Sequence, residues 1–222
     1  MSNKNLLFLY IIHQKYTGFK MNYPTFFNEI DTIELYDDLG EFLGAPADGK
    51  VTISYEDCVK FAGHSCPTVA GAYLMTLRGL QELYGDTLPQ RGSILVSNKA
   101  SEIEGVSGVV GNVVSYIVGA SGVGGFKGMM GHFSRDNLIK YDADIPLAIR
   151  LTRLDTNESV DVAIDSSSVP GNPAMKPLMA KSLQGLASQE EKNEFKKLWQ
   201  QRVEAMLVND ALWEQMITIQ KG

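Results

Sequence analysis

The chain has 222 residues, 44% of them hydrophobic, and its 20 Lys and Arg against 26 Asp and Glu give a formal net charge of −6 at pH 7. This length suits one folded domain with a helical addition, and the acidic balance argues against a nucleic-acid partner because no excess of basic side chains is available to neutralise phosphates. The two cysteines, Cys58 and Cys66, are too few for a disulfide framework, so we expect free thiols and a cytoplasmic protein.

The first segment of the chain differs in composition from the rest. Its apolar run, residues 6–12, follows a single lysine, lacks an Ala-x-Ala cleavage site and is too short to span a bilayer. We therefore expect neither a secretion signal nor a membrane partner. Residues 1–20 are interpreted as an extension ahead of a natural start at Met21.

The next segment alternates between short apolar runs and loops. Residues 32–36 fit either a short strand or part of a helix, and residues 44–49 have the composition of a loop. Residues 51–54 predict a strand, and Ser54 can cap a helix over residues 56–61. A longer helix is predicted over residues 68–84, since Pro67 suits a first helical turn.

The middle of the chain is rich in glycine and valine. A strand is predicted over residues 93–97, followed by a tightly packed helix over residues 109–118 and a loop over residues 119–131. Residues 147–154 and 159–164 alternate in polarity around a polar turn, and this pattern predicts an antiparallel hairpin.

Beyond Pro170 the pattern becomes helical and amphipathic, with Trp199 and Trp213 on an apolar stripe that is either core or a partner-binding face. The fold class is therefore predicted as α+β, with a mixed or antiparallel sheet packed against helices and a helical C-terminal arm. We expect a domain over residues 21–170 and the arm over residues 171–222.

The motif Gly63-His64-Ser65-Cys66-Pro67 carries the residue types best suited to chemistry. Cys66 is expected at a helix N-terminus, where unsatisfied N–H groups stabilise an anion such as a thiolate. One imidazole and one thiolate favour zinc first, with other late transition metals also suitable. The alternative is that Cys66 is a small buried hydrophobic residue and His64 a hydrogen-bonded turn residue.

Residues 61–75 resemble the Gly-His-x-Cys-Pro-Gly motif of the FmdE (FwdE-like) family of formylmethanofuran dehydrogenase proteins, and the order of elements fits over roughly residues 55–165. The resemblance implies a FwdE-like α+β domain with a mixed sheet. It also implies a bound metal, usually zinc, with His64 and Cys66 at the matching positions.

The chain departs from that family pattern in three ways. Thr68 follows the proline in place of glycine, Ala120 stands where the family has another cysteine, and the cysteine-rich ribbon of some members is absent from the C-terminus. The missing ligands must then come from water, another side chain or a second copy of the chain. The candidates are Asp57, Glu102, Glu104, His132 and, least favoured, His13; taken alone, Glu102, Glu104 and His132 are each better explained as solvated loop residues than as ligands.

The glycine-rich loop lacks the Gly-Lys-Ser/Thr ending of a phosphate-binding loop, so it is better explained by close backbone packing or as a loop that shapes the pocket beside the metal. Lys127 and Arg135 are candidates to hold an anionic substrate group there.

Two functions remain open: a metal- or thiol-dependent enzyme acting on a small molecule, and a non-catalytic accessory protein that carries or senses a metal for a larger enzyme. The apolar helix over residues 109–118 further predicts a symmetric homodimer that buries part of the glycine-rich segment or the C-terminal helices.

Overall fold

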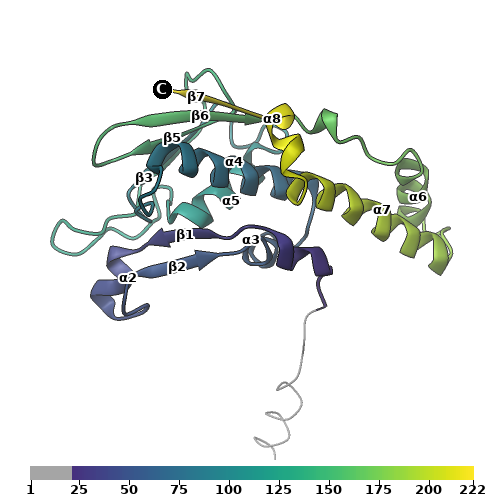
Figure 1. Cartoon of the computed structure of the whole chain (residues 1–222), viewed down its shortest axis with the longest axis horizontal. Coiled ribbons are helices and arrows are strands. Elements are labelled where there is room, and N and C mark those ends of the chain that lie inside the picture. Colours follow the sequence, from purple (N-terminus) through teal and green to yellow (C-terminus); the bar gives the residue numbers. More distant parts are fainter. Residues whose placement is uncertain (1–21) are drawn as a thin grey trace, which may run out of the picture.

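The computed structural model describes residues 22–222 and arranges them as two sheets with helices between and beside them (Figure 1). Helices α4 and α5 lie between the larger sheet and the smaller one, and α6 and α7 extend from one end (Figure 1). The expectations for residues 1–20, His13 included, fall outside the described residues. Within residues 22–222, no helix combines the length and the apolar character needed to cross a membrane.

The smaller sheet is a pair of antiparallel strands, β1 (Ile33–Tyr36) and β2 (Lys50–Ile53). Of the two interpretations of residues 32–36, the strand is correct: Ile33 and Leu35 are buried and Glu34 between them is exposed, as a half-buried strand requires. A 3-10 helix precedes this sheet, η1 (Thr25–Glu29), and a short helix joins its strands, α2 (Asp38–Leu43).

Two consecutive helices follow, and the motif Gly63–Pro67 forms the junction between them. The predicted cap is confirmed: α3 (Tyr55–Ala62) begins with a capping box in which Ser54 and Asp57 satisfy each other's backbone N–H groups. The next helix, α4 (Pro67–Tyr84), starts with its proline in the first turn, as predicted, and is buried along most of its length. It is the core helix of the molecule.

The larger sheet has five strands in the order β4-β3-β5-β6-β7 and is mixed, because β3 and β4 are parallel and the other pairs antiparallel. Its strands are β3 (Ile94–Asn98), β4 (Ile139–Lys140), β5 (Ile149–Arg153), β6 (Ser159–Ile164) and β7 (Ile217–Lys221). Gly79 lets α4 approach this sheet closely, since a Cβ there would lie 3.0 Å from Leu151 and 3.1 Å from Val162. The predicted α+β class, mixed sheet and hairpin are confirmed.

The glycine-rich stretch divides as expected into a helix, α5 (Ser107–Val118), and a loop. The helix buries Val113, Val114 and Ile117 and leaves Val109 partly exposed. Its apolar residues are therefore covered on one side and uncovered near its N-terminal end.

The C-terminal region is mainly helical, as predicted, but ends differently. Its helices are η2 (Ser166–Ser168), α6 (Met175–Leu183), α7 (Gln189–Leu207), η3 (Asp210–Leu212) and α8 (Trp213–Met216). The predicted helical arm covered residues 171–222, whereas residues 217–221 form β7 and complete the sheet beside β6. The spacing of apolar residues continues smoothly across this change, so the periodicity alone did not reveal the edge strand.

Candidate functional site

The Gly63–Pro67 turn joins α3 to α4 and is built by the capping needs of both helices. Gly63 ends α3 in the left-handed region at φ 78°, and its N–H bonds to the Val59 carbonyl. Cys66 is the N-cap of α4, with Pro67 directly after it. The turn therefore places His64 and Ser65 between two helix ends.

His64 is exposed, and its ring is oriented by one hydrogen bond. The Nδ1 atom lies 3.0 Å from the carbonyl oxygen of Ala62. Since a carbonyl can only accept, Nδ1 carries the proton of the neutral ring and Nε2 keeps its lone pair. This arrangement prepares Nε2 to accept a proton or to bind a cation.

Cys66 is buried, with 8% of its surface exposed. Its Sγ accepts a hydrogen bond from the Val69 N–H at 3.5 Å, which is the capping interaction predicted for a residue at this position. The second thiol behaves differently: burial raises the pKa of Cys58 to about 12, so that thiol stays protonated at neutral pH. Of the two cysteines, Cys66 is the one at a helix N-terminus.

Ser65 connects the turn to the C-terminal helix α7. Its hydroxyl donates to Gln200 Oε1 at 3.0 Å and lies 3.0 Å from the Tyr55 hydroxyl, while its carbonyl accepts from Trp199 Nε1 at 2.9 Å. Burial raises the pKa of Tyr55, so its hydroxyl keeps its proton and can donate to Ser65. Hydrogen bonds to α3 and to α7 therefore both hold the turn in place.

The turn and α7, together with α6 and the segment around η1, line a pocket of about 590 Å³, here called the His64 pocket. It is mainly apolar and aromatic, and its lining comprises Tyr23, Pro24, Phe27, Val59, Gly63, His64, Ser65, Met179, Phe195, Lys196, Trp199 and Gln200. Concave, mostly aromatic walls with a few polar groups are typical of small-molecule sites. Trp199, which the sequence assigned to a core or partner-binding stripe, is part of this wall.

The other metal-ligand candidates do not gather around His64 and Cys66. Within residues 22–222 there is no group of three or more His, Cys, Asp and Glu side chains that could hold a metal ion. Glu102, Glu104 and His132 are exposed, with Glu104 beside a separate pocket at the start of α5. Asp57 is occupied by the cap of α3. A complete ligand set therefore does not fit within the described part of one chain.

The two basic candidates, Lys127 and Arg135, form ion pairs with different carboxylates. Lys127 donates to Asp136 Oδ2 at 2.7 Å and remains largely exposed. Arg135 instead pairs with the buried Asp37, together with Arg91, whose Nη1 lies 3.1 Å from Asp37 Oδ2. Burial alone would raise the pKa of Asp37, but the hydrogen bonds from Arg135 and from the Gly40 N–H hold it below its ordinary value.

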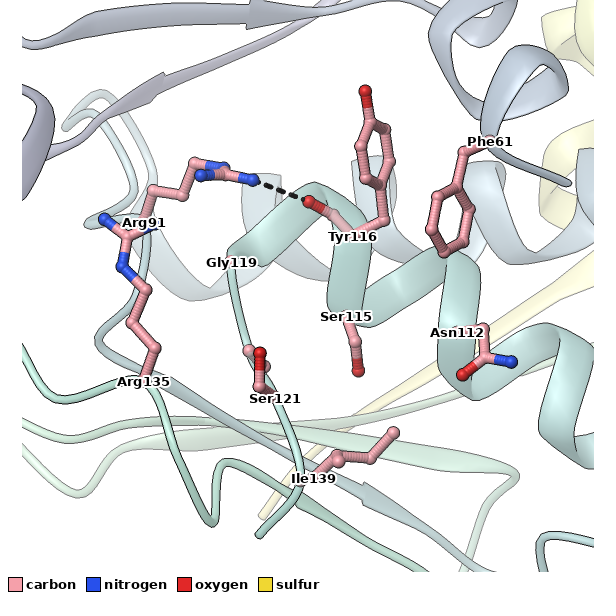
Figure 2. A pocket seen from close by; sticks show the side chains of 11 residues that line it. Phe61, Arg91, Asn112, Ser115, Tyr116, Gly119, Ser121, Arg135 and Ile139 are labelled. Atoms are coloured by element: carbon pink, nitrogen blue, oxygen red, sulfur yellow. Dashed lines mark hydrogen bonds between the residues drawn. The ribbon is translucent and has the colours of Figure 1, made fainter. Parts of the chain in front are cut away.

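A second pocket, here called the Arg135 pocket, has a volume of about 430 Å³ and lies beside the C-terminal end of α5 (Figure 2). Its lining comprises Phe61, Arg91, Asn112, Ser115, Tyr116, Gly119, Ala120, Ser121, Gly122, Arg135 and Ile139. The sequence did not point to Asp37 or Arg91, because their ion pairs join segments far apart in the chain, nor to Ser115, whose burial depends on packing. The glycine-rich loop lines this pocket through residues 119–122, and it does not line the pocket beside His64 where it was expected.

Comparison with protein-family models identifies a family. The family model FmdE, described as "FmdE, Molybdenum formylmethanofuran dehydrogenase operon", matches residues 61–212. The matched range includes His64, Cys66 and α7, so it spans both the turn and the helix that holds it. No curated protein matches the sequence.

Proposed function

This chain belongs to the FmdE family, and on that premise we propose that it binds a small, ring-containing molecule in the His64 pocket, with His64 as the group that meets the polar part of the ligand. The observation that carries the proposal is the placement of an oriented imidazole at the edge of an aromatic pocket. This arrangement supports ligand binding in the turn region that the family motif occupies.

The walls define the class of ligand. Phe27, Phe195 and Trp199 offer aromatic surface for a flat apolar body, which gains free energy by leaving water. The Nε2 atom of His64 is an acceptor, so the matching ligand group is a donor such as a hydroxyl or an N–H. Lys196 adds a positive charge to the same lining.

A ligand-observed NMR experiment on the full chain tests the proposal with phenol and its methyl ether, anisole, as probes. Phenol can donate to His64 Nε2 and anisole cannot, so wild-type protein should bind phenol about tenfold more tightly. His64→Ala should remove that preference, whereas His132→Ala, a matched change at an exposed loop histidine, should leave it intact. Equal affinity of wild type and His64→Ala for phenol would contradict the assignment.

A metal ion at the same turn is the second candidate. The family resemblance and the anchored Nδ1 of His64 favour zinc or another late transition metal on His64 and Cys66. The described part of one chain supplies two such ligands, so water, the bound molecule or a second chain would have to complete the coordination. Such a chain could serve a larger enzyme as a metal carrier or sensor.

Elemental analysis of the purified full chain separates the candidates. About one zinc per chain in wild type, lost in both His64→Ala and Cys66→Ser, would support a metal site. Metal retained in both variants would place it elsewhere, and a metal-free protein that still prefers phenol would leave small-molecule binding as the function of the turn.

A further inference from the structure

The Arg135 pocket contains two guanidinium groups and no carboxylate among its lining residues. Each of the three guanidinium nitrogens of Arg91 donates one hydrogen bond, to Asp37 and to the carbonyls of Tyr116 at 2.9 Å and Ile117 at 3.1 Å. Arg135 bonds to Asp37 through Nη2 alone, so its Nε and Nη1 have no hydrogen-bond acceptor among the described residues. Two positive charges against Asp37 leave one positive charge in excess beside the cavity.

A second observation comes from Ser115. This side chain is 7% exposed, and its Oγ has no hydrogen-bond partner among the described residues. Figure 2 shows it projecting from α5 into the space between Ser121 and Asn112. A buried hydroxyl without a partner costs free energy, and that cost is recovered if a bound molecule supplies the acceptor.

The remaining walls are apolar or aromatic. Phe61 and Tyr116 stack with their ring centroids 4.6 Å apart, and Ile139 lies on the opposite side in Figure 2. The cavity therefore combines a cationic end, a spare hydroxyl and an apolar side within a volume of about 430 Å³. These are the features that recognise an anionic head group on a compact apolar body.

We propose that the Arg135 pocket is a second binding site, distinct from the His64 pocket, for a small organic carboxylate. The carboxylate accepts a hydrogen bond from Ser115 Oγ, the excess positive charge of the Arg91–Arg135–Asp37 cluster attracts it, and the apolar body lies against Phe61 and Ile139. A singly charged group matches the single excess positive charge. Asp37 holds the cation in place without neutralising the site.

Benzoate and its neutral amide, benzamide, are the probes, applied to the full chain up to about 10 mM, a concentration that mostly fills even a site with a Kd near 1 mM. Amide chemical shifts should report benzoate binding at Ser115, Gly119 and Gly122, with benzamide at least tenfold weaker. Ser115→Ala should weaken benzoate about tenfold, whereas Ser107→Ala, the same change on the same helix outside this pocket, should leave it unchanged.

Ser115→Ala removes an unpaired buried hydroxyl, so the variant should fold at least as well as wild type. His64→Ala should not alter benzoate binding, which separates this site from the proposed function. Equal binding of benzoate and benzamide, wild-type affinity in Ser115→Ala, loss of the shifts in His64→Ala, or no shift at these residues would each overturn the proposal.

Discussion

The indole Nε1 of Trp199 donates a 2.9 Å hydrogen bond to the carbonyl oxygen of Ser65, 134 residues earlier in the chain. This single bond ties α7 to the turn that carries His64 and Cys66. The orientation of the turn therefore depends on a helix outside the short motif by which the turn is recognised.

Trp199→Phe should loosen the turn while keeping an aromatic ring in the pocket wall. The loss of one buried hydrogen bond should lower the free energy of unfolding by about 1 kcal/mol and shift the imidazole NMR signals of His64. Trp213→Phe is the matched control, because Trp213 Nε1 donates to the Met206 carbonyl at the same 2.9 Å. Identical His64 signals in both variants would show that Trp199 does not position the turn.

Cys58 should make the fold sensitive to alkali. Burial raises its pKa from 9.0 to about 12, so the unfolded chain releases this proton at lower pH than the folded chain does. Stability from this thiol is fully present below pH 9 and declines as the pH rises toward 12. In urea melts across that window, Cys58→Ala should flatten the slope of unfolding free energy against pH by about 1.4 kcal/mol per pH unit. An unchanged slope would contradict the assignment.

Asp37→Asn should destabilise the protein by about 3 kcal/mol, because it leaves two partly buried guanidinium groups without their anion. The lowered pKa of Asp37 gives stability that is present above its ordinary value of 3.8 and lost as the pH falls through the lower folded value. The variant should therefore lose part of the acid sensitivity of wild type in denaturant melts.

The matched control for that variant is Asp155→Asn, which breaks the pair of the exposed Asp155 with Arg153. A surface pair contributes less than about 1 kcal/mol, so this change should have little effect on stability. Equal losses in the two variants would show that the Asp37 cluster is no more important than a surface ion pair.

The start of α5 should form the contact of a homodimer. Ile103 and Val106 are 94% and 55% exposed, and Val109 is 36% exposed beside them, which places three branched apolar side chains in water. Light scattering should give about twice 24.4 kDa at micromolar concentration. Ile103→Glu should shift the protein toward monomer, whereas Leu183→Glu, at an 82% exposed position on α6, should not. A wild-type monomer would refute the dimer.

Local patterns were enough to predict much of the fold. Ser54 and Pro67 marked helix starts correctly, because capping depends on residues within one turn of the chain. The alternation around residues 155–158 predicted the hairpin for a similar reason. The end of the chain was harder, since residues 217–221 become a strand through their pairing with β6, a tertiary contact that periodicity does not encode.

Local sequence likewise predicted part of the candidate site, and the rest depends on tertiary packing. The motif located His64 and Cys66 at a helix start, but the fold leaves His64 exposed and Cys66 buried, a difference set by packing. Arg135 was singled out as an anion-binding residue; the structure places it beside a pocket, and the role itself stays a prediction. Its partners Asp37 and Arg91 lie 98 and 44 positions away, and no local signal joins them.

The contact between Ser65 and α7 has a consequence during synthesis. A ribosome adds roughly 5–20 residues per second, so the turn emerges at least several seconds before Trp199 and Gln200 do. Until then Ser65 lacks its C-terminal partners, and the aromatic side chains of the half-built pocket face water or a chaperone. The surface that later becomes the His64 pocket is therefore one of the places where the nascent chain can misassociate.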